Sequence, residues 1–151
     1  MDILRRNTDY ALRAMLNLAG HYGQEPVSTR QIAEAEDISY ELTCKLMQKL
    51  HSAGLVQSSM GPNGGFALSK KPDKINMLEI IEAIQGPLSL NRCLLEEDIC
   101  PNKEGCSITV ELAKLQKHIG KYLLGITLDE LVQSRCAKKK GKPKNIKRRK
   151  K

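Results

Sequence analysis

Apolar residues recur at helical spacing in the first third of the chain, and this recurrence predicts the first two helices. Between residues 9 and 22, small and aliphatic side chains return every three or four positions, so they share one face of a helix with Thr8 as its expected N-cap. Ser28 and Gln31 have the spacing of a capping box. A second, shorter helix is therefore predicted at 29–35.

A third helix is expected after a four-residue turn at 36–39. Ser39 is its expected N-cap, and Gly54 stands where a helix that ends near Ser52 needs a stop residue. Two short helices joined by a tight turn predict a helix-turn-helix, the motif that places its second helix in the major groove of DNA. The expected major-groove contacts are the outward-facing residues Tyr40, Thr43, Lys45, Gln48 and Lys49.

Two short segments, 55–59 and 65–68, flank a glycine-rich turn and predict a β-hairpin. The run Pro62-Asn63-Gly64-Gly65 supplies the bend and the positive φ angles of a hairpin tip. A helix-turn-helix followed directly by such a hairpin predicts a winged helix, although an ordinary surface hairpin gives the same pattern. Glycines also allow backbone N–H groups to approach a phosphate closely. The residues expected to touch the DNA backbone are Ser28, Thr29, Arg30, Asn63, Gly64 and Gly65.

The second half of the chain is expected to be helical. Capping boxes at 75–80 and 126–131 each open a helix, and the first of these helices ends at Gly86. Between them, a long helix at 107–124 carries an apolar stripe. Two such helices packed across a two-fold axis would bury the stripe and form a homodimer, although an intrachain core helix has the same pattern. The stripe consists of Ile108, Leu112, Leu115, Ile119, Tyr122 and Leu123.

The net charge of +8 is concentrated at one end of the chain. Residues 137–151 hold ten of the 25 Lys and Arg residues and no acidic residue. A segment of this composition cannot bury enough apolar surface to offset its ordering entropy, so it is predicted to be a disordered basic tail. Such a tail either solubilises the protein or tethers it electrostatically to phosphates.

Three of the five cysteines lie close together, at Cys93, Cys100 and Cys106, with gaps of six and five residues. Thiolates select soft or borderline metals, chiefly zinc or the iron of iron–sulfur clusters. Zinc knuckles use closely paired cysteines, whereas wider gaps suit a sulfide-bridged cluster better. Three unrelated thiols remain the alternative. An odd cysteine number also fits a reducing compartment, and the expected location is the cytoplasm.

A fourth ligand has to come from outside this cysteine triad. An oxygen ligand would bind iron more weakly than a thiolate and leave it open to a small molecule, as a sensor requires. Cys44, on the third helix, is interpreted as an ordinary helix residue, and Cys136 is interpreted chiefly as a free thiol. The candidates for the fourth ligand are Asp9, His118, Cys136, Glu96, Glu97 and Asp98.

Several functional classes are excluded by what the sequence contains. No window approaches the ~20 apolar residues that a membrane span needs, and the N-terminus has no secretory signal pattern. No nucleophile–base pair or phosphate-binding loop is present, so no enzymatic activity is expected. The expected fold is mainly α: a winged helix-turn-helix with a small β-hairpin wing and a long dimerisation helix.

In combination, these motifs resemble the IscR/NsrR family of iron–sulfur winged-helix regulators. The resemblance extends from residue 1 to about 133, and the wing motif followed by the cysteine triad is its most specific part. It is carried by Thr8-Asp9-Tyr10-Ala11-Leu12-Arg13-Ala14, Ile38-Ser39, Gly54-Leu55-Val56, Gly61-Pro62-Asn63-Gly64-Gly65-Phe66 and Pro87-Leu88-Ser89-Leu90.

The resemblance implies a homodimer that binds double-stranded DNA, with a [4Fe-4S] cluster favoured and a [2Fe-2S] cluster as the alternative. The sequence is more similar to the NsrR branch, which responds to nitric oxide and in which an aspartate, here Asp9, ligates the cluster of the partner subunit. The IscR branch has a histidine where this chain has Thr109. The family's usual arginine before the wing is replaced by Met60, and the first cysteine gap is one residue longer than usual.

The resulting functional expectation is a transcriptional regulator, with a repressor as the expected form, that senses nitric oxide, redox or iron–sulfur status. The alternatives are a winged-helix regulator with zinc or free thiols, and a basic RNA- or ribosome-associated protein. The chain lacks the aromatic platform that would stack RNA bases. The expected organisation is 1–71 winged helix-turn-helix, 72–107 connecting helix and cysteine loop, 108–136 dimerisation helix and C-terminal short helix, and 137–151 tail.

Overall fold

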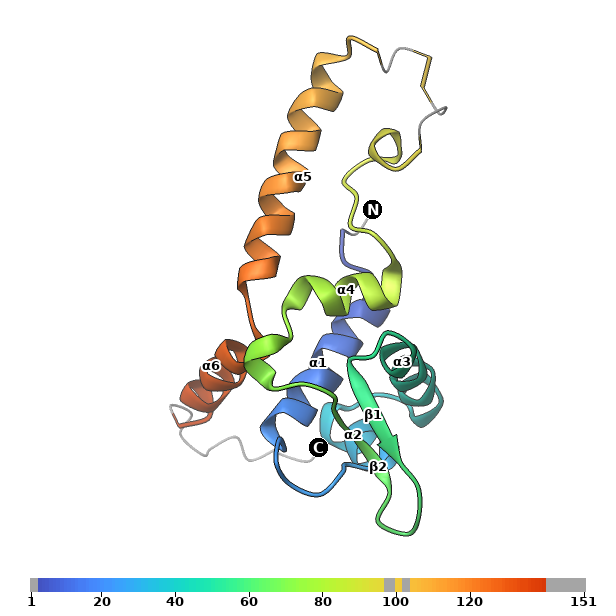
Figure 1. Cartoon of the computed structure of the whole chain (residues 1–151), viewed down its shortest axis with the longest axis vertical. Helices are drawn as coiled ribbons and strands as arrows, with labels where there is room; N and C mark the ends of the chain where they lie inside the picture. Colours follow the sequence, from blue (N-terminus) through green and yellow to red (C-terminus); the bar gives the residue numbers. More distant parts are fainter. Residues whose placement is uncertain (1–2, 97–99, 102–103, 141–151) are drawn as a thin grey trace, which may run out of the picture.

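The computed structural model describes residues 3–96, 100–101 and 104–140, apart from the side chains of 138–140, and shows a helical body from which one long helix projects (Figure 1). A two-stranded hairpin lies beside the helices of the body (Figure 1). The elements are α1 (Arg6–Gly20), α2 (Thr29–Glu36), α3 (Tyr40–Ser52), β1 (Val56–Ser59), β2 (Gly65–Leu68), η1 (Pro72–Lys74), α4 (Met77–Gln85), η2 (Arg92–Leu94), α5 (Ser107–Gly125) and α6 (Leu128–Lys140).

The helix-turn-helix forms where the capping residues predict it. Ser28 caps α2 by accepting a hydrogen bond from the Gln31 backbone N–H at 3.3 Å, while the Gln31 side chain accepts from the Ser28 N–H at 2.9 Å. The turn after α2 contains Asp37 in the left-handed region, with φ of 55°. Ser39 then caps α3 by accepting from the backbone of Leu42 at 3.4 Å. Local side-chain chemistry therefore fixes where each of the two helices begins.

The first helix begins earlier than predicted, and Thr8 is not its N-cap. The helix starts at Arg6 after an Arg5 cap without a side-chain hydrogen bond, and Thr8 is fully buried. The Thr8 hydroxyl donates to Gln85 Oε1 at 2.7 Å, and the Gln85 amide donates to the Ile3 carbonyl at 3.0 Å. The prediction was wrong because the polar partner of Thr8 comes from α4, far along the chain, rather than from its own helix end.

The hairpin pairs β1 and β2 antiparallel, with Val56 opposite Leu68 and Ser59 opposite Gly65. Val27, just before α2, adds a short third pairing, because its N–H and carbonyl both exchange hydrogen bonds with Phe66 at 2.9 Å. This bridge joins β2, close to the turn of the hairpin, to the start of the helix-turn-helix. The wing is consequently fixed to the body by backbone pairing as well as by side-chain packing.

The wing glycines serve a different purpose from the one predicted. In the turn, Gly61 has a positive φ of 110°, whereas Gly64 and Gly65 do not adopt positive φ. A Cβ at Gly65 would collide with the Val27 backbone and lie 2.8 Å from Ser28 N, and one at Gly64 would collide with the hairpin's own backbone. These two glycines are required by close packing within the chain rather than by turn geometry.

Replacing Gly65 with alanine is expected to destabilise the protein by about 2–3 kcal/mol, because the added methyl group overlaps backbone atoms that cannot move independently. Chemical denaturation monitored by circular dichroism measures this loss. Gly20→Ala is the matched control, because nothing lies within 4 Å of its Cβ position. If the two variants have equal stabilities, the close approach at Gly65 is relieved at no energetic cost and the interpretation is wrong.

One apolar core joins the elements of the body. Its buried members come from the first three helices, the hairpin, α4 and the start of α6; Met15, Met47, Ile80 and Leu128 are all fully buried. The predicted inner positions of α3 behave accordingly, with Leu46 and Leu50 buried and Leu42 partly buried against them. Because α4 and α6 pack back onto the winged helix, the core contains residues from three of the predicted ranges: 1–71, 72–107 and 108–136.

Helix α5 lies over Ser107–Gly125, one residue longer than the predicted 107–124, and none of its residues is buried. Its base is held by a short antiparallel bridge between Asn76 and Thr127, in which Met77 N–H donates to Ile126 O at 2.9 Å and Leu128 N–H donates to Ile75 O at 3.0 Å. The helix rises away from the body toward the segment that carries the cysteines (Figure 1).

The start of the predicted disordered tail is helical. Helix α6 continues through Lys140, so 137–140 belong to a helix whose first turns pack on the core through Leu128, Leu131 and Val132. The prediction failed there because the unfavourable step in forming a helix is its first turn, and each residue added to an anchored helix gains one further hydrogen bond. The remainder of the predicted tail, 141–151, lies outside the described residues.

Candidate nucleic-acid interface and cysteine loop

The exposed face of α3 carries most of the side chains that the sequence predicts for base recognition. Tyr40 is 54 % exposed, and Lys45, Gln48 and Lys49 are exposed as well. Thr43 has to be removed from the predicted set because it is fully buried and its hydroxyl donates to the Ser39 carbonyl at 2.9 Å. The helix is rotated so that Thr43 faces the core together with Leu46 and Leu50.

Two of these side chains have partners within the chain. Lys49 Nζ donates to the Ile84 carbonyl at 3.3 Å, so it helps to satisfy the C-terminal end of α4. A hydrogen bond between the side chains of Tyr40 and Cys44 is the main cause that raises the pKa of the Tyr40 hydroxyl above its usual value. This contact favours the neutral phenol, which can donate a hydrogen bond.

The predicted backbone-contact residues divide into free and occupied groups. Arg30 and Asn63 are exposed. Ser28 is half-buried with its hydroxyl engaged in the α2 cap, and Thr29 is also half-buried. Gly64 and Gly65 face their own chain, as described above. Met60, at the wing turn, is 98 % exposed and was not predicted as a contact.

The three clustered cysteines occupy one segment before α5, and all are half-buried free thiols. Cys93 lies in η2, Cys106 is the N-cap residue of α5, and Cys100 lies between them. Cys93 Sγ is 3.8 Å from Thr109 Oγ1. The pKa of the Cys106 thiol is lowered chiefly by a hydrogen bond with the Thr109 side chain, and to a smaller extent by one with the Thr109 backbone. Thr109 therefore contacts two of the three thiols.

Sequence reasoning noticed Thr109 only as a departure from a related motif. A better signal was available: Thr109 stands three residues after the N-cap Cys106, the spacing at which helix N-terminal side chains meet the cap residue. The sequence analysis also missed a contact that holds the cysteine loop in place. The Gln116 side chain accepts from the Leu90 N–H at 3.0 Å and ties the start of the loop to α5.

The structure does not gather the thiols into a finished metal site. Within the described residues, no three His, Cys, Asp or Glu side chains lie close enough together to hold a metal ion. Asp9 is exposed on the first turn of α1, His118 is exposed on α5, and Cys136 is exposed on α6. Glu96 borders the loop, whereas Glu97 and Asp98 lie outside the described residues. The donor set offers three soft ligands in one segment.

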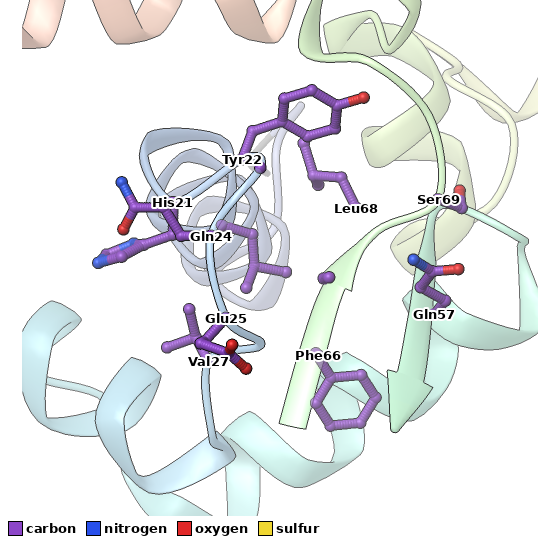
Figure 2. Close-up of a pocket in the computed structure, with 12 residues that line it drawn as sticks. His21, Tyr22, Gln24, Glu25, Val27, Gln57, Phe66, Leu68 and Ser69 are labelled. Atoms are coloured by element: carbon purple, nitrogen blue, oxygen red, sulfur yellow. The ribbon is translucent and has the colours of Figure 1, made fainter. Parts of the chain in front are cut away.

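A separate cavity of about 340 Å³ lies between the loop after α1 and the hairpin. Figure 2 shows His21, Tyr22, Gln24 and Glu25 on the loop side and Gln57, Phe66, Leu68 and Ser69 on the hairpin side. His21 Nδ1 is within hydrogen-bond distance of the Asn17 carbonyl, at 2.9 Å. The cavity contains no cysteine, so it is distinct from the cysteine loop.

In the part of the chain that the structure describes, none of the helices combines the length and the apolar character that crossing a bilayer demands.

Comparisons with known proteins agree on one family. The model of the Rrf2 family, an iron-dependent transcriptional regulator, matches residues 4–134. The HTH-type transcriptional regulator IscR of Aliivibrio salmonicida is 36 % identical over 123 residues, which cover 82 % of this chain and 73 % of that protein. A protein of Azotobacter vinelandii described as a putative HTH-type transcriptional regulator is also 36 % identical, over 82 % of this chain and 74 % of its own length.

Solved structures show the same architecture. CymR, the global cysteine regulator of B. subtilis, superposes with a TM-score of 0.72 at 29 % identity and covers 89 % of this chain and 98 % of its own. The IscR structure from T. potens superposes with a TM-score of 0.71, also at 29 % identity, over 94 % and 93 %.

These likenesses confirm the winged-helix fold class and the resemblance found in the sequence. The relatives are transcriptional regulators, which confirms that the chain is not an enzyme. The family model matches residues 4–134, and the chain folds as a winged helix with an exposed α3 face. This chain therefore belongs to the Rrf2 family of iron-dependent transcriptional regulators.

Proposed function

We propose that the protein is a homodimeric regulator that binds double-stranded DNA and whose affinity for DNA depends on an iron–sulfur cluster held by Cys93, Cys100 and Cys106. The observation that carries this proposal is the separation of two functional ends along one long helix. The winged helix lies at one end of α5, and the three free thiols lie at the other. The cytoplasm, where thiols stay reduced, is the proposed location.

The DNA-reading surface is formed by α3 and flanked by the wing. Lys45 and Gln48 project from the exposed face of α3, where their long polar side chains can reach base edges. Arg30 at the start of α2 and Asn63 in the wing stand on either side and are suited to phosphate contacts. Because Val27 joins the wing to α2 by backbone pairing, both flanks hold a fixed position relative to α3.

The dimer is proposed from the uncovered apolar side chains of α5. A helix that presents this much apolar surface to water has a strong tendency to pack against a second copy. A two-fold pair of α5 helices would place two α3 helices on one face of DNA. In this arrangement 1–71 read DNA and 108–136 dimerise. The exposed large apolar residues of α5 are Ile108 (69 %), Val110 (53 %), Leu115 (50 %), Tyr122 (70 %) and Leu124 (56 %).

The cysteine loop is suited to the cluster by its donor chemistry. Thiolates are the ligands that iron–sulfur clusters use, and Thr109 already favours the thiolate form of Cys106. The fourth donor is proposed to be Asp9 of a second copy, since this exposed carboxylate lies on a different element from the loop. When bound, a [4Fe-4S] cluster, or alternatively a [2Fe-2S] cluster, would supply iron that reacts with nitric oxide or oxidants.

The chain's own residues connect the loop to the reading head. Gln116 holds the loop onto α5, and the bridge at Asn76 and Thr127 holds the base of α5 onto the body. A change of pose at the loop can alter DNA affinity only if the two poses bind DNA differently. Repression is the proposed direction of regulation, with nitric oxide, redox or iron–sulfur status as the proposed signal.

Anaerobic purification followed by iron and sulfide analysis tests the proposal directly. We expect a brown protein with broad visible absorption, acid-labile sulfide, and a DNA affinity that changes on titration with nitric oxide. A colourless protein with stoichiometric zinc, or with reduced thiols and no metal, would instead support the alternative regulator. Two observations support this alternative, a winged-helix regulator with zinc or free thiols. The chain is similar to CymR, a global cysteine regulator, and within the described residues no three potential metal ligands lie close together.

The RNA-binding alternative is tested by deleting 138–151. Binding that depends on the basic segment would be abolished by the deletion, whereas specific DNA binding through α3 and the wing would only weaken and lose part of its salt dependence.

Lys45→Ala is expected to lower the affinity for a selected DNA duplex about tenfold, because a base or phosphate contact of this kind contributes about 1–3 kcal/mol. Fluorescence anisotropy at several salt concentrations measures the effect. Lys49→Ala, which also releases the Ile84 carbonyl, is expected to lower both stability and affinity. Lys74→Ala, on η1, serves as the control. If Lys45→Ala and Lys49→Ala bind as tightly as the wild type with the same salt dependence, α3 is not the reading helix.

A further inference from the structure

A buried carboxylate joins the helix-turn-helix to α6. Glu36 is the last residue of α2 and only 3 % exposed. Arg135 of α6 donates from Nη2 to both carboxylate oxygens of Glu36, at 2.9 and 3.0 Å. Asn17 of α1 donates from Nδ2 to Glu36 Oε1 at 3.1 Å. A charge this deeply buried is stable only when it is paired and hydrogen-bonded, so the Glu36 carboxylate can be buried here only because Arg135 and Asn17 bind it.

Helix α1 adds a second guanidinium to the same residue. Arg13 Nη2 donates to the Glu36 backbone carbonyl, and Arg13 Nε lies 3.8 Å from Glu36 Oε2. The Arg13 guanidinium also lies over the Tyr10 ring, 5.7 Å from its centroid. Glu36 thus receives donors from both α1 and α6. Because Asp37 begins the turn immediately after it, the position of Glu36 fixes where the turn into α3 starts.

Helix α6 is in turn tied to the base of α5. Only Ile126 and Thr127 separate the two helices, and both belong to the bridge, in which Ile126 O accepts from Met77 N–H and Thr127 lies opposite Asn76. Leu128, the first residue of α6, is fully buried in the core. Arg135 lies about two helical turns further along α6. These contacts form a continuous connection from the base of α5 through α6 and Arg135 to Glu36.

We infer that Arg135 is a positioning residue for DNA recognition: through Glu36 it holds the helix-turn-helix at a fixed orientation relative to α5. This inference rests on the proposed homodimeric DNA binding. In a dimer built on α5, the orientation of each helix-turn-helix relative to α5 sets the distance between the two α3 helices. That distance determines which half-site spacing the protein accepts. Arg135 then governs selectivity for spacing without touching DNA.

The test compares affinities for duplexes that differ only in half-site spacing. A duplex is first selected from a random pool with the full-length wild-type protein, and versions with one or two base pairs added or removed between the half-sites are then prepared. Binding is measured by fluorescence anisotropy, at a temperature well below the measured Tm of each variant. We expect Arg135→Gln to reduce the discrimination between the best and the shifted spacings about tenfold, because each reading head becomes less constrained.

Three further variants separate positioning from stability. Arg135→Lys keeps one charged donor toward Glu36 and is expected to restore most of the discrimination. Asn17→Ala removes one donor from Glu36 and leaves the ion pair, so it is expected to cause a smaller loss and serves if Arg135→Gln does not fold. Lys74→Gln, which removes a charge from an exposed pair with Asp73, is the charge-matched control and is expected to retain the wild-type preference.

The outcomes distinguish this inference from the function on which it rests. A dimeric wild type whose spacing preference is unchanged in Arg135→Gln or Asn17→Ala, even with a lowered Tm, overturns the positioning role alone. A wild type that is monomeric by light scattering, or indifferent to spacing, overturns the dimeric function and the inference together.

Discussion

Replacing Leu115 and Tyr122 of α5 with glutamate is expected to convert the protein into a monomer and to lower its affinity for a two-half-site duplex about 100-fold. The two side chains are 50 % and 70 % exposed in the single chain, so the substitutions should leave the fold intact. In a dimer built on α5 the new carboxylates would be buried without partners, which is strongly unfavourable. A monomer also loses the gain in affinity that comes from linking two reading heads.

Light scattering coupled to gel filtration measures the oligomeric state, and anisotropy with one- and two-half-site duplexes measures the affinity. Tyr22→Glu is the matched control, since Tyr22 is a similarly exposed tyrosine, 47 % accessible, that follows α1 instead of lying on α5. A double variant that remains dimeric and binds with wild-type affinity would show that the apolar face of α5 is not the dimer interface.

Replacing Cys93, Cys100 and Cys106 together with serine is expected to remove iron and sulfide from the anaerobically purified protein. DNA affinity should then become independent of nitric oxide and differ at least about tenfold from that of the intact protein, within the usual range of allosteric coupling. The physical reason is that serine hydroxyls do not supply the thiolate ligands that iron–sulfur clusters require. Metal analysis, visible absorption and anisotropy under anaerobic conditions measure these changes.

Cys136→Ser is the control for this prediction, because Cys136 is an exposed thiol on α6, away from the cysteine loop. It should retain the cluster and the response to nitric oxide. If anaerobic wild type and triple variant bind DNA identically, with and without nitric oxide, the cysteines do not regulate DNA binding and the proposed sensing role is wrong.

The helix-turn-helix and its wing were predictable because their signals are local. Ser28, Gln31 and Ser39 make the predicted caps, and the antiparallel hairpin pairs within the predicted segments. The range of α5 and the placement of the three cysteines in the segment before it also follow the sequence pattern. Each of these features depends on residues within about one or two helical turns or one hairpin, a range in which spacing alone specifies the contact.

Predictions failed where a residue has a partner far along the chain or a rotation that spacing leaves open. Thr8 has the chemistry of an N-cap but binds Gln85, 77 residues away. Thr43 lies close to the edge of the exposed face of α3, and packing of the helix against the core turns it inward. Gly64 and Gly65 are demanded by neighbouring backbone, which a turn motif does not reveal.

The sequence by itself therefore determined the fold class, the order of elements, the exposed polar face of α3 and the presence of a thiol-rich segment, because caps, periodicity and cysteine spacing act over short stretches of chain. Only the tertiary structure decided which side chains of that face are free, why the wing needs its glycines, and how α6 meets the helix-turn-helix. The Arg135–Glu36 contact spans 99 residues. A contact of that kind exists because several helices pack around one core, and no local pattern encodes the geometry of that packing.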